Sequence, residues 1–212
     1  MKIFLRLILS RLFGSAGLAL LFFAGSRLAA TTVIPPDFDQ LVNDSDYIIR
    51  AVVKSVDSEY QTTNGGGKKI VTKVALDVKE VIAGTPPKDV VLEMLGGRVG
   101  DERMVVEGAP TFKVGDEDIL FVRGNGHTIV PLVAMMHGRY PILREAGTGR
   151  QYMARDNRMP LTATAEIAQP ITKAEAATAK APAKAASQAM TPEEFIQQIK
   201  SAVNPRYVRT KS

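Results

Sequence analysis

The clearest pattern in the chain is a strict alternation of positions over residues 70–78. One set of alternating positions is apolar or small and polar: Ile70, Thr72, Val74, Leu76 and Val78. The other set carries the charges: Val71, Lys73, Ala75, Asp77 and Lys79. A period of two predicts a β-strand with one buried face and one wetter face.

Other apolar runs bounded by turn residues predict further strands. They span residues 47–56, 90–95, 119–122, 128–134, 138–143 and 151–154. The glycine-rich residues 61–68 predict a hairpin tip, and residues 96–111 predict a loop with room for a short strand. Short strands with frequent turns and no helix between them favour a mainly β fold. We therefore predict a small antiparallel Greek-key OB-like barrel over residues 31–160.

Two short helices are expected outside the strands. Residues 35–46 predict a stiff proline lead-in and a short helical turn. Residues 191–204 predict a C-terminal helix, because Thr191, Pro192 and Glu194 form a capping pattern ahead of an apolar stripe. Docking of this stripe on the barrel is favoured over a role as a tether to a partner, since such stripes mostly bury within their own domain.

The composition changes after residue 160. Of the 28 residues 163–190, 12 are Ala, and Lys, Thr and Pro fill much of the rest. Such a segment buries little apolar area, so residues 161–190 are predicted to form a disordered, flexible Ala/Lys/Pro-rich linker.

The N-terminus has the layout of a secretory signal peptide. Residues 1–11 are basic without acids, residues 12–24 are apolar, and small residues follow up to Ala30. An uncleaved anchor is the alternative, although 13 apolar residues are too few for a good membrane span. Residues 1–30 are therefore predicted to be a signal, cut after Ala30 or, alternatively, after Ser26. The mature protein would be periplasmic, cell-surface or secreted, with no stable membrane span.

The charge of the whole chain is misleading. The net charge is +5, but residues 1–30 carry four of the 27 Lys/Arg and none of the 22 Asp/Glu, which leaves a net of +1 in the mature chain. A near-neutral domain offers no electrostatic footprint for nucleic acid. The chain also has no cysteine, so disulfides cannot support its core.

No enzyme motif is found in the chain. The two histidines, His127 and His137, lack the companions of a zinc site, and Gly67-Lys68 is not followed by the residues of a phosphate-binding loop. The acidic residues 116–118 stand at a turn, where solvated charge is the ordinary interpretation. The sequence therefore predicts a non-enzymatic protein with no cofactor and no metal of its own.

Two stretches carry a family resemblance. The chain reads Thr-Thr-Val-Ile-Pro-Pro at residues 31–36, then Ser45-Asp46 leads into the apolar strand with Ile49-Arg50-Ala51. Together with the later residues 79–84 and 114–121, this resembles the N-terminal, netrin-like OB domain of the tissue inhibitors of metalloproteinases, over roughly residues 31–132. The family's first and third residues are cysteines, whereas Thr31 and Val33 stand here.

The resemblance implies an inhibitor mechanism. In the family, the free amine and first carbonyl of the mature chain chelate the protease's zinc, and the second side chain enters the specificity pocket. Thr31 and Thr32 take those places here, and Thr31, Thr32, Val33 and Ile34 are the expected partner-binding residues. The partner would be a secreted zinc metalloprotease.

The alternative function is a structural or surface-assembly protein of unknown partner. Residues 92–100, Leu-Glu-Met-Leu-Gly-Gly-Arg-Val-Gly, also resemble an exported bacterial family of unknown function. That second resemblance implies no activity.

Overall fold

A six-stranded antiparallel sheet forms the centre of the structure, a computed structural model that describes residues 33–63, 65–171 and 183–203. Its strands, in the spatial order β3-β2-β1-β6-β7-β8, are β3 (Val91–Leu95), β2 (Lys68–Gly84), β1 (Tyr47–Thr62), β6 (Glu117–Val122), β7 (Arg139–Arg144) and β8 (Gln151–Met153). A separate two-stranded sheet pairs β4 (Gly97–Val99) with β5 (Glu102–Met104). The mainly β, antiparallel fold expected from the sequence is confirmed.

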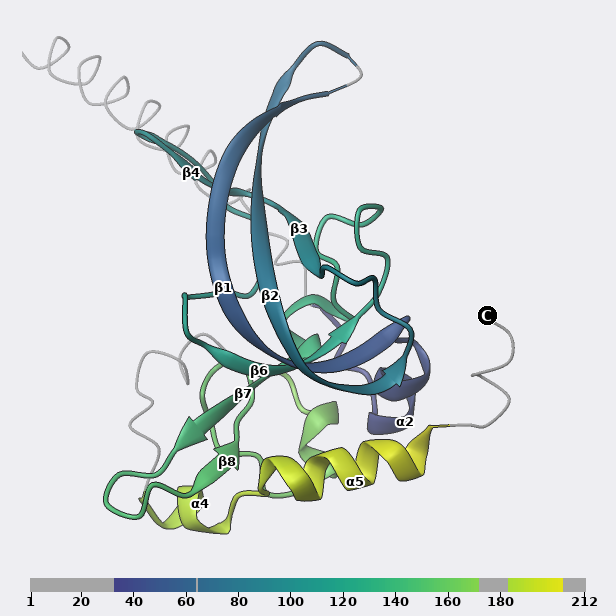
Figure 1. The fold of residues 1–212 in the computed structure, drawn as a ribbon, viewed down its shortest axis with the longest axis vertical. Helices are drawn as coiled ribbons and strands as arrows, with labels where there is room; N and C mark the ends of the chain where they lie inside the picture. The colour runs from purple at the N-terminus through teal and green to yellow at the C-terminus, as the bar shows by residue number, and fades with distance from the viewer. Residues whose placement is uncertain (1–32, 64, 172–182, 204–212) are drawn as a thin grey trace, which may run out of the picture. The chain divides into compact units, whose positions relative to one another are not determined.

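The chain returns from β3 to β6 through the long connection that contains β4 and β5. It thereby places β6 beside β1, which is the spatial order of a Greek key. β1 and β2 are the longest strands, and their hairpin extends well beyond the other strands (Figure 1).

The sheet is not closed into a barrel, so the predicted barrel is wrong in this respect. Loops occupy both edges instead of a closing strand pair. At β3, Leu95 N donates to Ile129 O at 2.7 Å, and at β8, Met153 N donates to Met190 O at 2.8 Å. The predicted strand over residues 128–134 is irregular, with one isolated bridge from Leu132 to Val122. Pro131 lies within it and has no N–H for a ladder.

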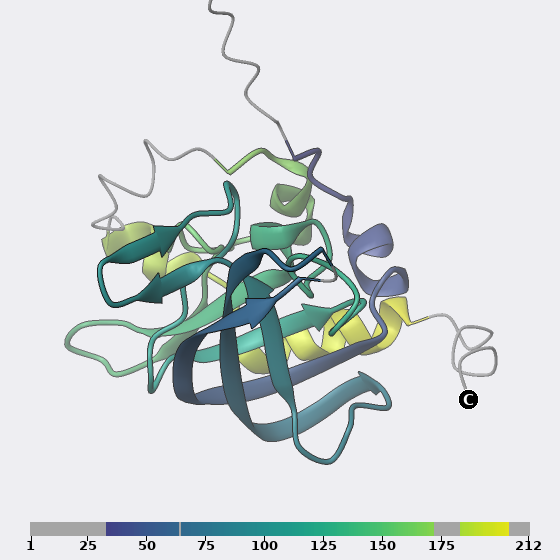
Figure 2. The ribbon, with the colours of Figure 1, turned by 90° about the horizontal axis from the view of Figure 1, so that it is seen from above.

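The sheet is buried on both faces. Successive residues of β1 point to opposite sides of the sheet. Ile48 and Ile49 are 1% and 0% exposed and belong to different apolar clusters. The first cluster packs under the helices and includes Leu41, Phe121, Tyr140, Leu161, Phe195 and Ile199. The second lies in the concave side of the curled sheet and includes Val53, Val74, Leu92, Phe112, Leu120 and Leu132. Figure 2 shows the curl of the strands.

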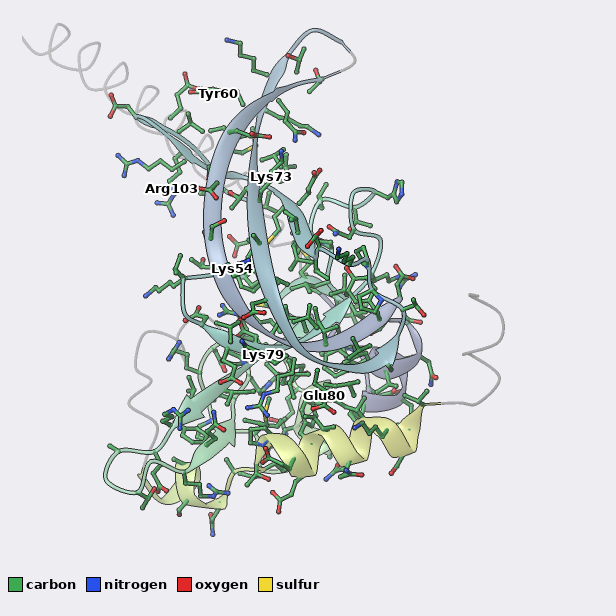
Figure 3. The ribbon with its side chains drawn as sticks, viewed as in Figure 1. Lys54, Tyr60, Lys73, Lys79, Glu80 and Arg103 are labelled. Atoms are coloured by element: carbon green, nitrogen blue, oxygen red, sulfur yellow. The ribbon has the colours of Figure 1, made fainter. Side chains whose placement is uncertain are left out.

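Helix α5 (Pro192–Ala202) docks on the first cluster, as the apolar stripe predicts. Its capping box is formed by Thr191 and Glu194, and its Phe195 ring centroid lies 5.2 Å from that of Tyr140. Lys200 Nζ lies 2.8 Å from Glu80 Oε1 of β2, above the helix in Figure 3. The helix near the start of the described chain, α2 (Phe38–Asn43), is capped by Asp37 and packs beside α5.

Much of the predicted linker is packed rather than disordered. Helix η2 (Thr164–Ala168) buries Ile167, and α4 (Ala183–Gln188) is followed by the buried Met190. Leu161 is also fully buried. The alanine-rich composition gave no indication of these contacts. A few well-placed apolar side chains suffice to hold a segment on an existing core. Residues 172–182 lie outside the described residues.

The predicted signal, residues 1–30, also lies outside the described residues. Among the helices that the structure does describe, none is long and apolar enough to cross a membrane.

We expect Phe195→Ala to lower the free energy of unfolding by about 3–5 kcal/mol, because it empties a fully buried aromatic site. Urea unfolding followed by circular dichroism measures this. Gln197→Ala, an exposed change in the same helix, is the control and is expected to cost under about 0.5 kcal/mol. Equal losses for the two variants would show that α5 does not carry the core.

Candidate functional site

A cleft of about 290 Å³ lies on the concave face of the β1–β2 hairpin. The strands β1, β2 and β3 form its floor, and β4, β5 and residues 105–112 form its walls. Its apolar lining comprises Val56, Val74, Met94, Val106, Ala109 and Phe112. The cleft exists because β6 pairs with β1 only as far as Val52, so no further strand covers this end of the hairpin.

A chain of hydroxyl hydrogen bonds fixes the turn between β3 and β4 at the cleft. Thr72 Oγ1 donates to Gly96 O at 2.7 Å and lies 2.9 Å from Ser58 Oγ, so the Ser58 hydroxyl donates to Thr72. Both hydroxyl protons are therefore used within the protein. A Cβ on Gly97 would lie 2.2 Å from Thr72 Oγ1, so only glycine fits there. This close approach explains the glycine at residue 97.

Two arginines line the cleft from the β4–β5 hairpin. Arg98 and Arg103 are directly opposite each other in the two-stranded sheet, and both are exposed. Figure 3 shows Arg103 beside the upper half of the β1–β2 hairpin. Within the described part of the chain, neither forms an ion pair with a carboxylate, and no acidic side chain lines the cleft. Like charges directly opposite in a sheet are destabilising, although Arg98 Nε also donates to the carbonyl oxygen of Gly100 at 3.0 Å in the turn between β4 and β5.

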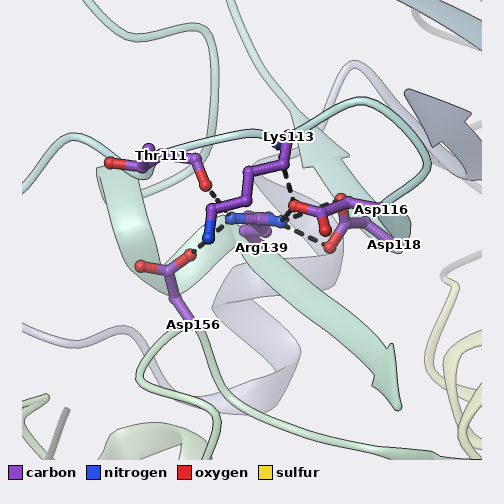
Figure 4. A network of polar contacts seen from close by, with 6 residues as sticks. All are labelled: Thr111, Lys113, Asp116, Asp118, Arg139 and Asp156. Atoms are coloured by element: carbon purple, nitrogen blue, oxygen red, sulfur yellow. Dashed lines mark hydrogen bonds and ion pairs between the residues drawn. The ribbon is translucent and has the colours of Figure 1, made fainter. Parts of the chain in front are cut away.

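A buried arginine lies at the base of the cleft wall. Arg139 of β7 is 4% exposed and contacts three carboxylates (Figure 4). Its Nη2 lies 2.7 Å from Asp116 Oδ2, its Nε lies 3.0 Å from Asp118 Oδ1, and its Nη1 lies 3.4 Å from Asp156 Oδ1. Arg139 also donates to the carbonyl oxygen of Thr111.

Arg139 is shared among three carboxylates, and the positive charge of Arg158 also acts on Asp118 and Asp156. Burial raises the pKa of Asp118, against the attraction of Arg139. Burial also raises the pKa of Asp156, to about 6, and the negative charge of Asp118 adds to this effect. Burial alone would lower the pKa of Arg139, but attraction to Asp118 and Asp156 outweighs burial and raises it.

Arg139 fixes the wall of the cleft through two neighbouring residues. The guanidinium carbon lies 4.4 Å from the centroid of the Phe112 ring, which itself lines the cleft, and Thr111 lines it next to Phe112. The loop that forms the wall is therefore bound at its base by a hydrogen bond and a cation–π contact.

His137 is a second buried titratable group in this region. It is 2% exposed, and its Nδ1 has no hydrogen-bond partner among the described residues. Burial, together with the nearby positive charge of Arg155, lowers the pKa of His137 to about 4. His127 lies on the surface, in the loop after β6. Over the described ranges, no group of three or more His, Asp or Glu side chains is placed to hold a metal ion.

The structure places the predicted partner-binding residues only in part. Thr31 and Thr32 lie outside the described residues. Val33 lies at the wall loop, since its Cγ2 would be 3.7 Å from a Cβ on Gly108. Ile34 is 83% exposed. The N-terminal segment and the cleft therefore meet at the same loop, which the sequence did not predict.

The interpretation of residues 116–118 as solvated charge is wrong for Asp118, which is 0% exposed and paired with Arg139. The register Asp118↔Pro141 and Ile119↔Tyr140 brings β6 and β7 together, and no local pattern reveals that pairing. The cleft arginines were also missed. A signal for the burial of Asp118 and Arg139 was present, because each of these residues stands directly before an apolar run.

Comparison of the chain with protein-family models, with curated proteins and with solved structures gives no match. The netrin-like resemblance stays a prediction from the sequence.

We expect Arg139→Met to lower the free energy of unfolding by about 3–5 kcal/mol, because it leaves Asp118 buried without a cation. Chemical unfolding measures the change. Arg123→Met is the matched control: the Arg123–Asp44 pair is 56% and 52% exposed and is expected to contribute under about 1 kcal/mol. A loss at Arg139 no larger than that of the control would contradict the structural role of the network.

The two perturbed groups give opposite dependences of stability on pH. Asp156 has a folded pKa above its ordinary value, so its contribution falls as pH rises from about 4 to about 6. His137 has a folded pKa below its ordinary value, so its contribution rises from about pH 4 to about 6.5. Each effect is on the order of 2–3 kcal/mol, so the two largely cancel.

Single substitutions should separate the effects of Asp156 and His137 on the pH dependence of stability. We expect Asp156→Asn to become more stable as pH rises through this window, and His137→Gln to become less stable. Unfolding free energies measured at several pH values in both variants test this, with the unaltered protein between them. Parallel curves for all three proteins would show that neither group is perturbed as described.

Proposed function

We propose that this protein is an exported, non-enzymatic binding domain that inhibits a secreted zinc metalloprotease through its mature N-terminus. The observation that carries the proposal is the exposure of Ile34, 83%, directly before two prolines and a capped helix. A large aliphatic side chain held in water at the start of the domain is suited to burial against a partner.

The residues after Ile34 support a stiff presentation of this segment. Pro35 and Pro36 have fixed φ angles, and Pro36 is buried at the start of α2. Val33 is half-buried and lies near Gly108. A segment restrained in this way loses less conformational entropy on binding than a free chain end, and no disulfide is available to restrain it.

The chemistry of inhibition follows from the expected new N-terminus. A catalytic zinc keeps one coordination position open for water or substrate. With cleavage after Ala30, the amine nitrogen and carbonyl oxygen of Thr31 would take that position, and the side chain of Thr32 would enter the neighbouring pocket. Cleavage after Ser26 would leave four more residues in front and block the amine.

The test is inhibition of a panel of secreted zinc metalloproteases by protein that begins at Thr31. We expect inhibition, its loss when one alanine precedes Thr31, and roughly tenfold weaker inhibition by Ile34→Ser, because an aliphatic contact is lost. Val81→Ser is the matched control, since Val81 is a 48% exposed apolar residue on β2, away from the N-terminal segment.

Mass spectrometry of the protein recovered after export supplies the second check, with Thr31 as the expected first residue. Absence of inhibition by protein beginning at Thr31, or a mature chain that starts after Ser26, would contradict the proposal. A structural or surface-assembly role would then be the remaining interpretation.

A further inference from the structure

The β4–β5 cleft combines two features that ordinary folding does not require. Its floor is largely apolar, and β4, β5 and residues 105–112 cover it only in part, although both faces of the sheet are well packed elsewhere. Its rim holds two arginines placed opposite each other without a carboxylate partner in the described ranges. Each feature raises the free energy of the empty protein, and one ligand relieves both.

We propose that this cleft is a binding site for a small aliphatic carboxylate. The hydrocarbon chain would lie against the partly exposed Val56, Val106 and Ala109, and the carboxylate would lie at Arg98 and Arg103. A guanidinium offers paired donors that match the two oxygens of a carboxylate, which suits this head group better than a neutral one.

The rest of the lining supports an ionic head group on an otherwise apolar ligand. The hydroxyl protons of Ser58 and Thr72 are already donated to Thr72 and Gly96, so they offer nothing to a neutral polar ligand. The cleft lining contains no acidic side chain that would repel a carboxylate or attract a cation. Selectivity for an anion therefore rests on the two arginines alone.

The size of the cleft limits the ligand to a small molecule. Its volume of about 290 Å³ is near the lower end of ordinary ligand pockets, which begin at about 300 Å³. The wall loop is fixed through Thr111 and Phe112 by Arg139, so the site is preformed on that side. This inference does not depend on the proposed inhibition, because Ile34, whose exposure carries that proposal, does not line the cleft.

The probe is octanoate, titrated by calorimetry at low ionic strength into protein that begins at Thr31. Octanol has the same chain without the charge, and acetate has the charge without the chain. We expect saturable binding of octanoate, weaker binding of octanol and none of acetate. Added salt should weaken the binding of octanoate but not that of octanol.

Variants locate the site. The double change Arg98→Gln and Arg103→Gln should weaken octanoate binding about tenfold or more. Arg144→Gln is the control, because Arg144 is an exposed arginine of β7 outside the cleft. Ala109→Phe fills the cleft and should abolish binding, and thermal unfolding of each variant shows that it is folded.

Three results would overturn the proposal. They are absence of saturable octanoate binding, equal affinity in the unaltered protein and the double arginine variant, and unchanged binding in folded Ala109→Phe. A peptide with a free apolar C-terminus is tested beside its amidated form. Binding of the free peptide without binding of octanoate would assign the cleft to a protein terminus and would also overturn the proposal.

Discussion

The ion cluster of Arg139 is the constraint on which the arrangement of the loops depends. Its guanidinium joins β7 to β6 through Asp118, to the turn before β6 through Asp116, and to the chain after β8 through Asp156. Burying these charges costs free energy that their attraction offsets only when every hydrogen bond is made. Apolar side chains of the same volume would stabilise a core equally well. What they would not provide is a directional hold on the Thr111 carbonyl and the Phe112 ring, so the cluster is best understood as a positioning device.

The loop held by this cluster is shared by both candidate binding surfaces. Phe112 and Ala109 line the cleft, while Gly108 of the same loop lies at Val33, where the described chain begins. The loop contains Pro110 and has no regular ladder of its own, so its conformation depends on tertiary contacts rather than on local propensity. An arginine buried beneath it gives it a fixed position that its own sequence cannot specify.

Local patterns predicted the local structure and failed where distant segments meet. The alternation over residues 70–78 and the capping residues before α5 act within one element, and the structure has both. Closure of the sheet depends on which segments pair at its edges. Residues 128–134 are apolar enough for a strand, but Pro131 and the contacts to β3 hold them as an irregular edge cover. The burial of Asp118 and of Ile167 likewise depends on partners far along the chain, Arg139 for one and the helix-side core for the other.

The strands pair with one another over unequal lengths, and this explains the position of the cleft. β1 and β2 pair with each other along nearly their whole length, but β6 pairs with β1 only to Val52, and β3 pairs with β2 only from Val71 to Ala75. Beyond Val52, β1 has no strand partner in this sheet other than β2, and apolar residues of β1, β2 and β3 on the concave face line the cleft there. The β4–β5 hairpin covers that face only in part and carries charges rather than apolar side chains above it. A longer β6 would have closed this surface into the core, so the short pairing is what leaves an apolar floor next to two arginines that have no carboxylate partner in the described ranges.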